Sequence, residues 1–144
     1  MEASVNTEYL ISYYNGNSGG NGYIKVGTVT GTASRPVYTS GTLISVNQPW
    51  NEISVDAPQL GSTKLINTGG TNMRAPIYRN GYLWAAHSVY LPATGTATRA
   101  ATDFWQINPT TNAVVQYGRI DDPTNALWTA YPSLAVTASN DVLI

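Results

Sequence analysis

The amino-acid sequence predicts an all-β protein built of antiparallel sheets. Only 10% of its residues are charged, against about 25% in a typical soluble domain. Threonine, serine, asparagine and glycine take the place of charge, together with ten tyrosines and four tryptophans, and these residues favour strands and turns. No window of about a dozen residues has apolar positions at helical spacing without an interruption by glycine, proline or a β-branched cluster. We therefore expect strands throughout the chain.

The N-terminal part predicts a β-hairpin followed by a weaker strand. Residues 23–29 alternate between two faces, residues 9–14 supply the partner strand, and the glycine- and asparagine-rich residues 15–22 form the loop between them. The pattern is weaker further on, where one strand is expected at residues 42–46.

A long surface connection leads into a more regular second half. This connection, residues 51–70, carries one short strand at residues 64–66. Four consecutive strands joined by short turns then predict an up-and-down antiparallel unit, and two further strands follow a loop. The six strands expected in this half cover residues 75–78, 81–90, 98–107, 113–120, 133–137 and 141–144.

The strand register of the four-stranded unit can be predicted from its loops. Centring the first turn between Thr94 and Gly95 sets Trp84 opposite Trp105 and His87 opposite Thr102, and centring the second between Thr110 and Thr111 sets Thr102 opposite Arg119. Aromatic residues then pair across strands and lie on both faces. A sheet with large apolar groups on both faces is expected to be covered on both sides, so Trp84 and Trp105 are predicted core residues.

A short self-similarity recurs along the chain. Asn21-Gly22, Asn80-Gly81 and Asn140-Asp141 each precede a strand, at separations of 59 and 60 residues. The pattern is consistent with a structural repeat and equally with ordinary turn chemistry, in which Asn-Gly is common.

Composition excludes several classes of function. The net charge is −1 and no basic cluster is present, so neither nucleic acid nor a membrane surface is an expected partner. The absence of cysteine excludes disulfides and zinc–thiolate sites. Asp121-Asp122 lacks the spacing of a calcium loop and is expected to form a turn before Pro123. No metal or cofactor is expected, and no signal peptide is recognisable at the N-terminus.

Four segments carry a resemblance to known proteins: residues 74–87, 104–108, 115–119 and 131–144. They are similar to blades of bacterial β-propellers, in particular poorly characterised secreted propellers loosely akin to sialidases. The resemblance implies antiparallel four-stranded blades around a central channel and a secreted or periplasmic location. The length suffices for about two blades, so the chain is expected to hold an incomplete propeller.

The resemblance also implies how the single domain, residues 1–144, is organised. Residues 1–50 are a partial blade, residues 51–120 are the connection and one full blade, and residues 121–144 are half a blade. This last half is expected to complete the N-terminal hairpin of another copy, which gives a head-to-tail homo-oligomer. The alternative is that the chain is a fragment of a longer propeller, without a function of its own.

Five residues are candidates for ligand binding. His87 is the only histidine, and it is either an acid–base or sugar-binding group or a half-buried residue satisfied by Thr102 or the backbone. Trp50 and Trp128 lie in expected loops, where their rings either stack on carbohydrate or pack against the rest of the chain. Copies of Arg74 would meet around the channel of a ring, and Arg119 shares a row with His87. No residue is assigned a catalytic role.

The function expected from these features is that of a binding or structural module of β-propeller type, with carbohydrate as the ligand class. The alternative enzyme is a sialidase-like glycoside hydrolase with sites built across subunits. Its signatures are weak, because the five arginines are scattered and Ser139-Asn140-Asp141 lacks the glycine and tryptophan of the sialidase box. Whether the chain is an enzyme therefore stays open at this point, with binding favoured over catalysis.

Overall fold

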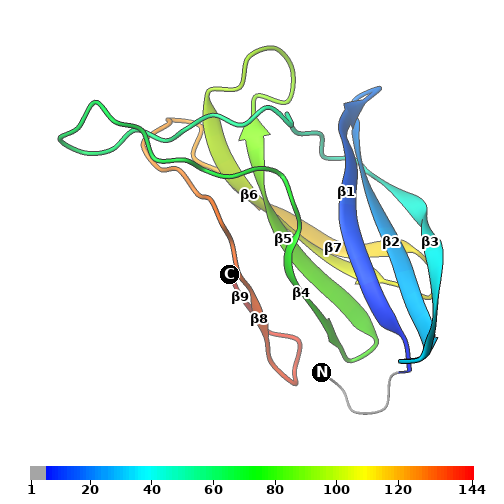
Figure 1. Ribbon diagram of the computed structural model, residues 1–144. Helices are drawn as coiled ribbons and strands as arrows, with labels where there is room; N and C mark the ends of the chain where they lie inside the picture. Colours follow the sequence, from blue (N-terminus) through cyan, green and yellow to red (C-terminus); the bar gives the residue numbers. More distant parts are fainter. Residues whose placement is uncertain (1–5) are drawn as a thin grey trace.

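A computed structural model describes residues 6–144 and confirms an all-β fold, with three antiparallel sheets and no helix in that part of the chain (Figure 1). The sheets contain strands β1–β3, β4–β7 and β8–β9, each in sequential order. The strand bounds are β1 Glu8–Ser18, β2 Asn21–Thr32, β3 Arg35–Val46, β4 Arg74–Arg79, β5 Tyr82–Leu91, β6 Arg99–Asn108, β7 Ala113–Ile120, β8 Ala135–Val136 and β9 Val142–Leu143.

The first sheet is larger than predicted. The expected loop at residues 15–22 is wrong, because β1 and β2 continue to a two-residue turn at Gly19 and Gly20, with φ values of 62° and 84°. Two successive positive φ angles are typical of the tight hairpin turn that glycine permits. β3 spans Arg35–Val46 rather than residues 42–46, and it pairs with β2 along its length.

The four-stranded sheet is confirmed, and each of its strands begins and ends within one residue of the prediction. Its register is shifted by one residue, so Trp105 lies opposite Ala85 rather than Trp84. His87 likewise lies opposite Asp103 and not opposite Thr102. Arg119 also lies opposite Asp103, where Thr102 was predicted.

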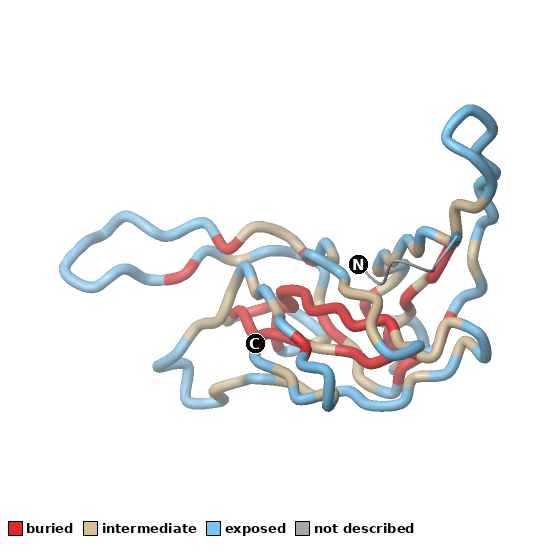
Figure 2. The backbone as a smooth tube through the Cα atoms, turned by 90° about the horizontal axis from the view of Figure 1, so that it is seen from below, coloured by how far each residue is buried: buried red, intermediate tan, exposed pale blue. Residues whose placement is uncertain are grey.

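The first and second sheets pack face to face around one hydrophobic core. β5 and β6 are buried along almost their whole length (Figure 2), as predicted for a sheet that is covered on both faces. The core combines side chains of β2 and β3 with side chains of β5 and β6, and Trp50 completes it. Trp84 and Trp105 are buried, as expected.

The C-terminal hairpin lies beside β4, on the side away from the first sheet (Figure 1). The Asn80 amide at the β4–β5 turn donates to Ala138 O at 2.9 Å and to Asn140 Oδ1 at 2.8 Å. On the other side of β4, the rings of Tyr9 and Tyr78 stack with centroids 5.0 Å apart. The first strands of the three sheets, β1, β4 and β8, therefore follow one another across the molecule.

Two features of the connecting segments differ from the prediction. The strand expected at residues 64–66 is reduced to a single bridge between Ala57 and Ile66. This bridge closes the base of a projecting arm, residues 57–66 (Figure 1). The three members of the expected repeat occupy different turns. Asn21 follows the Gly19-Gly20 turn, Asn80 and Gly81 form a two-residue turn, and Asn140 ends the longer turn between Thr137 and Asp141.

Candidate functional site

The structure separates the five candidate residues into two groups. Trp50, His87 and Arg119 come together between the first two sheets, whereas Arg74 and Trp128 lie around a surface pocket on the other side of the four-stranded sheet. The two groups have different environments and are described separately.

His87 is fully buried in the interior. Its Nδ1 lies 3.0 Å from Thr71 O, and since a carbonyl only accepts, Nδ1 carries the proton. Within the described residues, Nε2 has no hydrogen-bond partner. Burial, with a smaller contribution from the nearby charge of Arg119, lowers the pKa of His87 to about 4, although the bond to Thr71 opposes the shift. His87 is therefore neutral at physiological pH, and its ring is not open to a ligand.

Arg119 is bound by a buried acid that the sequence analysis did not single out. Its Nε and Nη2 donate to the two carboxylate oxygens of Asp103, each at 2.7 Å. Burial raises the pKa of Asp103, and the guanidinium opposes that shift. Nη2 also donates to Pro49 O at 3.1 Å, so Arg119 joins β7 to the segment that leads into Trp50.

Of the two roles expected for Trp50, the structure shows packing and not an exposed platform, because Trp50 is fully buried. Its ring meets His87 edge-on, with centroids 5.0 Å apart, and the backbone N–H of Trp50 donates to Gly16 O at 2.8 Å. A Cβ on Gly22 would lie 2.1 Å from the Trp50 ring. Two glycines of the first hairpin thus leave the space that this ring fills, and they are the sequence signal for its burial.

The second group lies at an open pocket of about 410 Å³ between the base of the arm and residues 126–131, which Trp128 lines and Arg74 does not. Trp128 and Tyr131 line it, together with Ile66, Asn67 and Leu127. Trp128 is half-buried and packs against a small cluster around Tyr90, and its Nε1 is buried with no partner in the described part of the chain. Trp128 therefore lies in a loop, as expected, and forms one wall of the pocket.

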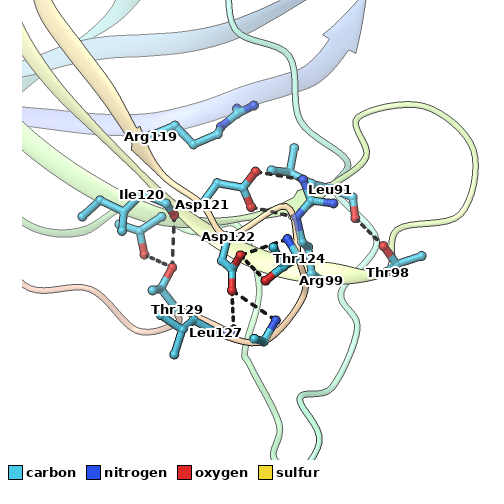
Figure 3. Close-up of polar contacts among 12 residues, drawn as sticks. Leu91, Thr98, Arg99, Arg119, Ile120, Asp121, Asp122, Thr124, Leu127 and Thr129 are labelled. Carbon is cyan, nitrogen blue, oxygen red and sulfur yellow. Dashed lines mark hydrogen bonds and ion pairs between the residues drawn. The ribbon is translucent and has the colours of Figure 1, made fainter.

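Asp122 shapes the loop that carries Trp128 (Figure 3). Its carboxylate accepts hydrogen bonds from the backbone N–H groups of Thr124, Ala126 and Leu127, and these bonds and the Thr124 hydroxyl lower its pKa. The turn predicted at Asp121-Asp122 is thereby confirmed. Asp121 accepts two bonds from Arg99, at 2.7 and 2.8 Å (Figure 3), which fixes the start of the same loop to β6.

Tyr131 was not predicted as a site residue. It has a φ of 53°, a left-handed conformation that bulky residues rarely adopt. Its N–H donates to Ser88 Oγ at 3.0 Å, and its hydroxyl donates to Asn67 Oδ1 at 2.9 Å. The guanidinium carbon of Arg74 lies 5.3 Å from the centre of its ring. The structure therefore brings Arg74 to the pocket through Tyr131.

In residues 6–144, no group of three histidine or acidic side chains is placed to hold a metal ion. No helix in that range has the length and apolarity needed to cross a membrane.

No protein-family model matches this chain, and comparisons with curated proteins and with solved structures find no match either. The function therefore has to be inferred from the geometry of the chain itself.

Proposed function

We propose that this chain is a binding module of β-propeller type and that its ligand is a carbohydrate, held in the pocket beside Trp128 and Tyr131. The properties of this pocket are the main support for the proposal. Its volume of about 410 Å³ lies in the range typical of small-ligand sites, about 300–1,000 Å³. It combines aromatic and apolar walls with a few polar groups, which is how such sites bind and orient a ligand.

The polar groups of the pocket suit hydroxyl-rich ligands. Asn67 and Thr68 line it beside the aromatic side chains. The Asn67 amide donates to Asp56 Oδ1 at 3.2 Å, so a carboxylate lies next to the amide at the exposed edge. Carboxylates and amides accept hydrogen bonds from hydroxyl groups, while the aromatic rings can stack against the apolar face of a sugar.

The position of His87 excludes it as an acid or base for chemistry in this pocket. It is the only histidine of the chain, and it lies in the interior with a pKa of about 4. A general acid or base must reach the reacting group through a hydrogen bond or one water, and His87 is fully buried.

A carbohydrate array and two variants with opposite effects on the pocket test this proposal. We expect the labelled wild-type chain to bind a subset of carbohydrates, and Trp128→Ala to lose at least about tenfold in affinity, since each 1.4 kcal/mol of contact free energy corresponds to a factor of ten. Trp128 is half-buried, so its removal can also affect folding.

Ala126→Trp serves as the second variant because Ala126 is exposed and lines the pocket, so the added ring fills the space without a change in the core. Tyr38→Ala is the matched control, since Tyr38 is 61% exposed on β3 of the first sheet and does not line the pocket. If no carbohydrate binds, or if both pocket variants bind as the wild type does, the proposal is wrong.

The partner we propose for the open sheet face is a second copy of this chain, in a head-to-tail assembly. The inner face of the first sheet packs on the second sheet, whereas its outer face exposes Leu10, Tyr14 and Leu43 at 45%, 59% and 45%. The succession of β1, β4 and β8 supports a blade-like stack that another copy would continue. The N-terminal sheet already has three strands, so one added strand would complete a four-stranded blade.

Light scattering of the purified chain across a concentration series tests this assembly. We expect an oligomer that dissociates when Leu10→Glu and Leu43→Glu place charges on the outer face. A folded wild-type monomer at every concentration would exclude the assembly without affecting the proposal for the pocket.

A further inference from the structure

An arginine lies against an aromatic wall at the edge of the proposed carbohydrate pocket. The Arg74 guanidinium carbon is 5.3 Å from the centre of the Tyr131 ring, and Tyr131 lines the pocket. Tyr131 is 51% exposed, so one part of its ring is available to a ligand. Both side chains are positioned by unusual backbone conformations.

Tyr131 is fixed in a strained conformation by contacts on three sides. Its φ of 53° is unfavourable for a bulky side chain, and such strain persists only where the surroundings over-determine it. Ser88 accepts from its N–H and Asn67 accepts from its hydroxyl. A Cβ on Gly69 would lie 2.8 Å from the ring, so Gly69 permits the ring to lie where it does. Residues in this state are concentrated at ligand-binding sites.

Arg74 is directed by a second strained residue. Ala75 has a φ of 36° and precedes Pro76, and the pairing of β4 with β5 is interrupted between Arg74 and Ile77. Such irregularities re-aim a side chain and are common beside functional sites. Two backbone outliers, at Ala75 and Tyr131, therefore converge on one pair of side chains.

The charge of Arg74 is not neutralised by an ion pair within the described residues. Arg99 and Arg119 are bound to Asp121 and Asp103, but no carboxylate in residues 6–144 lies within ion-pairing distance of Arg74. Its guanidinium is instead stacked on Tyr131.

The pocket edge consequently has a basic end and an acidic end. From Arg74, contacts run through the Tyr131 ring to Asn67, and from Asn67 to the Asp56 carboxylate. A ligand lying along this edge meets a cation at one end and a hydrogen-bond acceptor for hydroxyl groups at the other.

We infer that the Arg74–Tyr131 pair selects an acidic saccharide, with a carboxylate or sulfate group of the sugar at Arg74. The inference rests on the proposed function and specifies its ligand class. A guanidinium presents a planar fork of donors that matches the oxygens of such groups. Stacking on Tyr131 limits the rotation of that fork, so less conformational entropy is lost when it binds.

Three oligosaccharides of equal length test the inference: a uronic acid oligomer, its carboxyl-reduced neutral form, and a sulfated derivative of that neutral form. We expect the wild-type chain to bind at least one acidic form about tenfold more tightly than the neutral one, a difference that corresponds to one good charge-assisted contact. The two acidic forms decide between carboxylate and sulfate. The preference is expected to weaken as salt is added.

The Arg74→Gln variant is expected to lose the preference, measured as the ratio of its own affinities for the acidic and the neutral oligosaccharide. Arg79→Gln is the matched control, because Arg79 lies at the other end of β4 and does not line the pocket. Equal wild-type affinity for acidic and neutral forms, or a preference that survives Arg74→Gln, would overturn this inference and leave the proposed function standing. A failure to bind any oligosaccharide would overturn both.

Discussion

Asp103 binds Arg119 through two hydrogen bonds of 2.7 Å, and the Asp103 side chain is completely buried. The pair joins β6 to β7, and the additional bond from Arg119 to Pro49 O connects both strands to the segment before Trp50. Because Trp50 is part of the main core, this ion pair links the edge of the four-stranded sheet to the packing between the first two sheets.

Replacing Arg119 with glutamine is expected to destabilise the chain strongly. The change leaves the Asp103 carboxylate buried without a cation, and removing one partner of a buried pair costs about 3–5 kcal/mol. Urea unfolding followed by fluorescence measures the loss. The Arg99→Gln variant is the control, since the Arg99–Asp121 pair is 17% exposed on both sides and pairs nearer the surface contribute about 0–1 kcal/mol. Equal losses in the two variants would contradict the role of burial.

The buried neutral His87 is expected to make the chain less stable in acid. Burial lowers its pKa to about 4 in the folded state, whereas an unfolded histidine has a pKa of about 6.5. Between these values only the unfolded chain takes up the proton, so stability falls as the pH drops from about 6.5 to about 4. The total loss is about 3 kcal/mol, because one pKa unit corresponds to about 1.4 kcal/mol.

Unfolding of the wild type and of His87→Gln at several pH values isolates this contribution. Burial raises the pKa of the neighbouring Asp103, and a raised carboxyl pKa has the opposite effect, since it destabilises the folded chain as the pH rises. That effect is present in both proteins and cancels when they are compared. An identical pH dependence in the two proteins would show that His87 is not the group that titrates.

Much of the fold could be predicted from the sequence, because short turns and alternating patterns define strands locally. The register could not. The β5–β6 pairing begins at Leu91 and Arg99, so its loop is centred on Gly95 and not between Thr94 and Gly95, and this difference of half a residue shifts every pairing by one. One step in register moves each side chain to the other face, which is why His87 meets Asp103 and not Thr102.

The β6–β7 pair shows a second reason for the difference. The predicted register holds next to the turn, where Asn108 lies opposite Ala113, and it fails beyond an irregularity between Gln106 and Ile107. A bulge of this kind adds one residue to one strand, and nothing in the local sequence marks it. The candidate site could be predicted only in part. Trp128 and Arg74 were predicted as site residues, but Tyr131 reaches them through a left-handed backbone conformation before Pro132, and the sequence does not mark this conformation.

Replacing Gly22 with alanine is expected to destabilise the core. The added Cβ would lie 2.1 Å from the Trp50 ring, and overpacking of a well-packed core costs about 1–3 kcal/mol. Gly70→Ala is the control, because its Cβ would meet no atom closer than Asn72 Nδ2 at 3.9 Å. Thermal unfolding compares the two variants. If Gly22→Ala melts with Gly70→Ala at the wild-type temperature, Trp50 is not packed on Gly22.

Replacing Asn80 with glycine is expected to release the C-terminal hairpin and to leave the rest of the fold intact. Glycine accepts the positive φ of 51° at this turn, so the change removes the bonds from the Asn80 amide to Ala138 O and Asn140 Oδ1 with little backbone strain. Each bond contributes about 1 kcal/mol. Hydrogen exchange should therefore accelerate at the amides of Thr137 and Asn140, which bond within the β8–β9 turn, while the amides of β5 and β6 stay protected.

Asn112→Gly is the matched control, since Asn112 has a φ of 55° in the β6–β7 turn, and it should leave exchange in the hairpin unchanged. Equal acceleration in both variants, or none in Asn80→Gly, would mean that the hairpin is held beside β4 by the packing of Val136, which is 8% exposed, rather than by the asparagine pair.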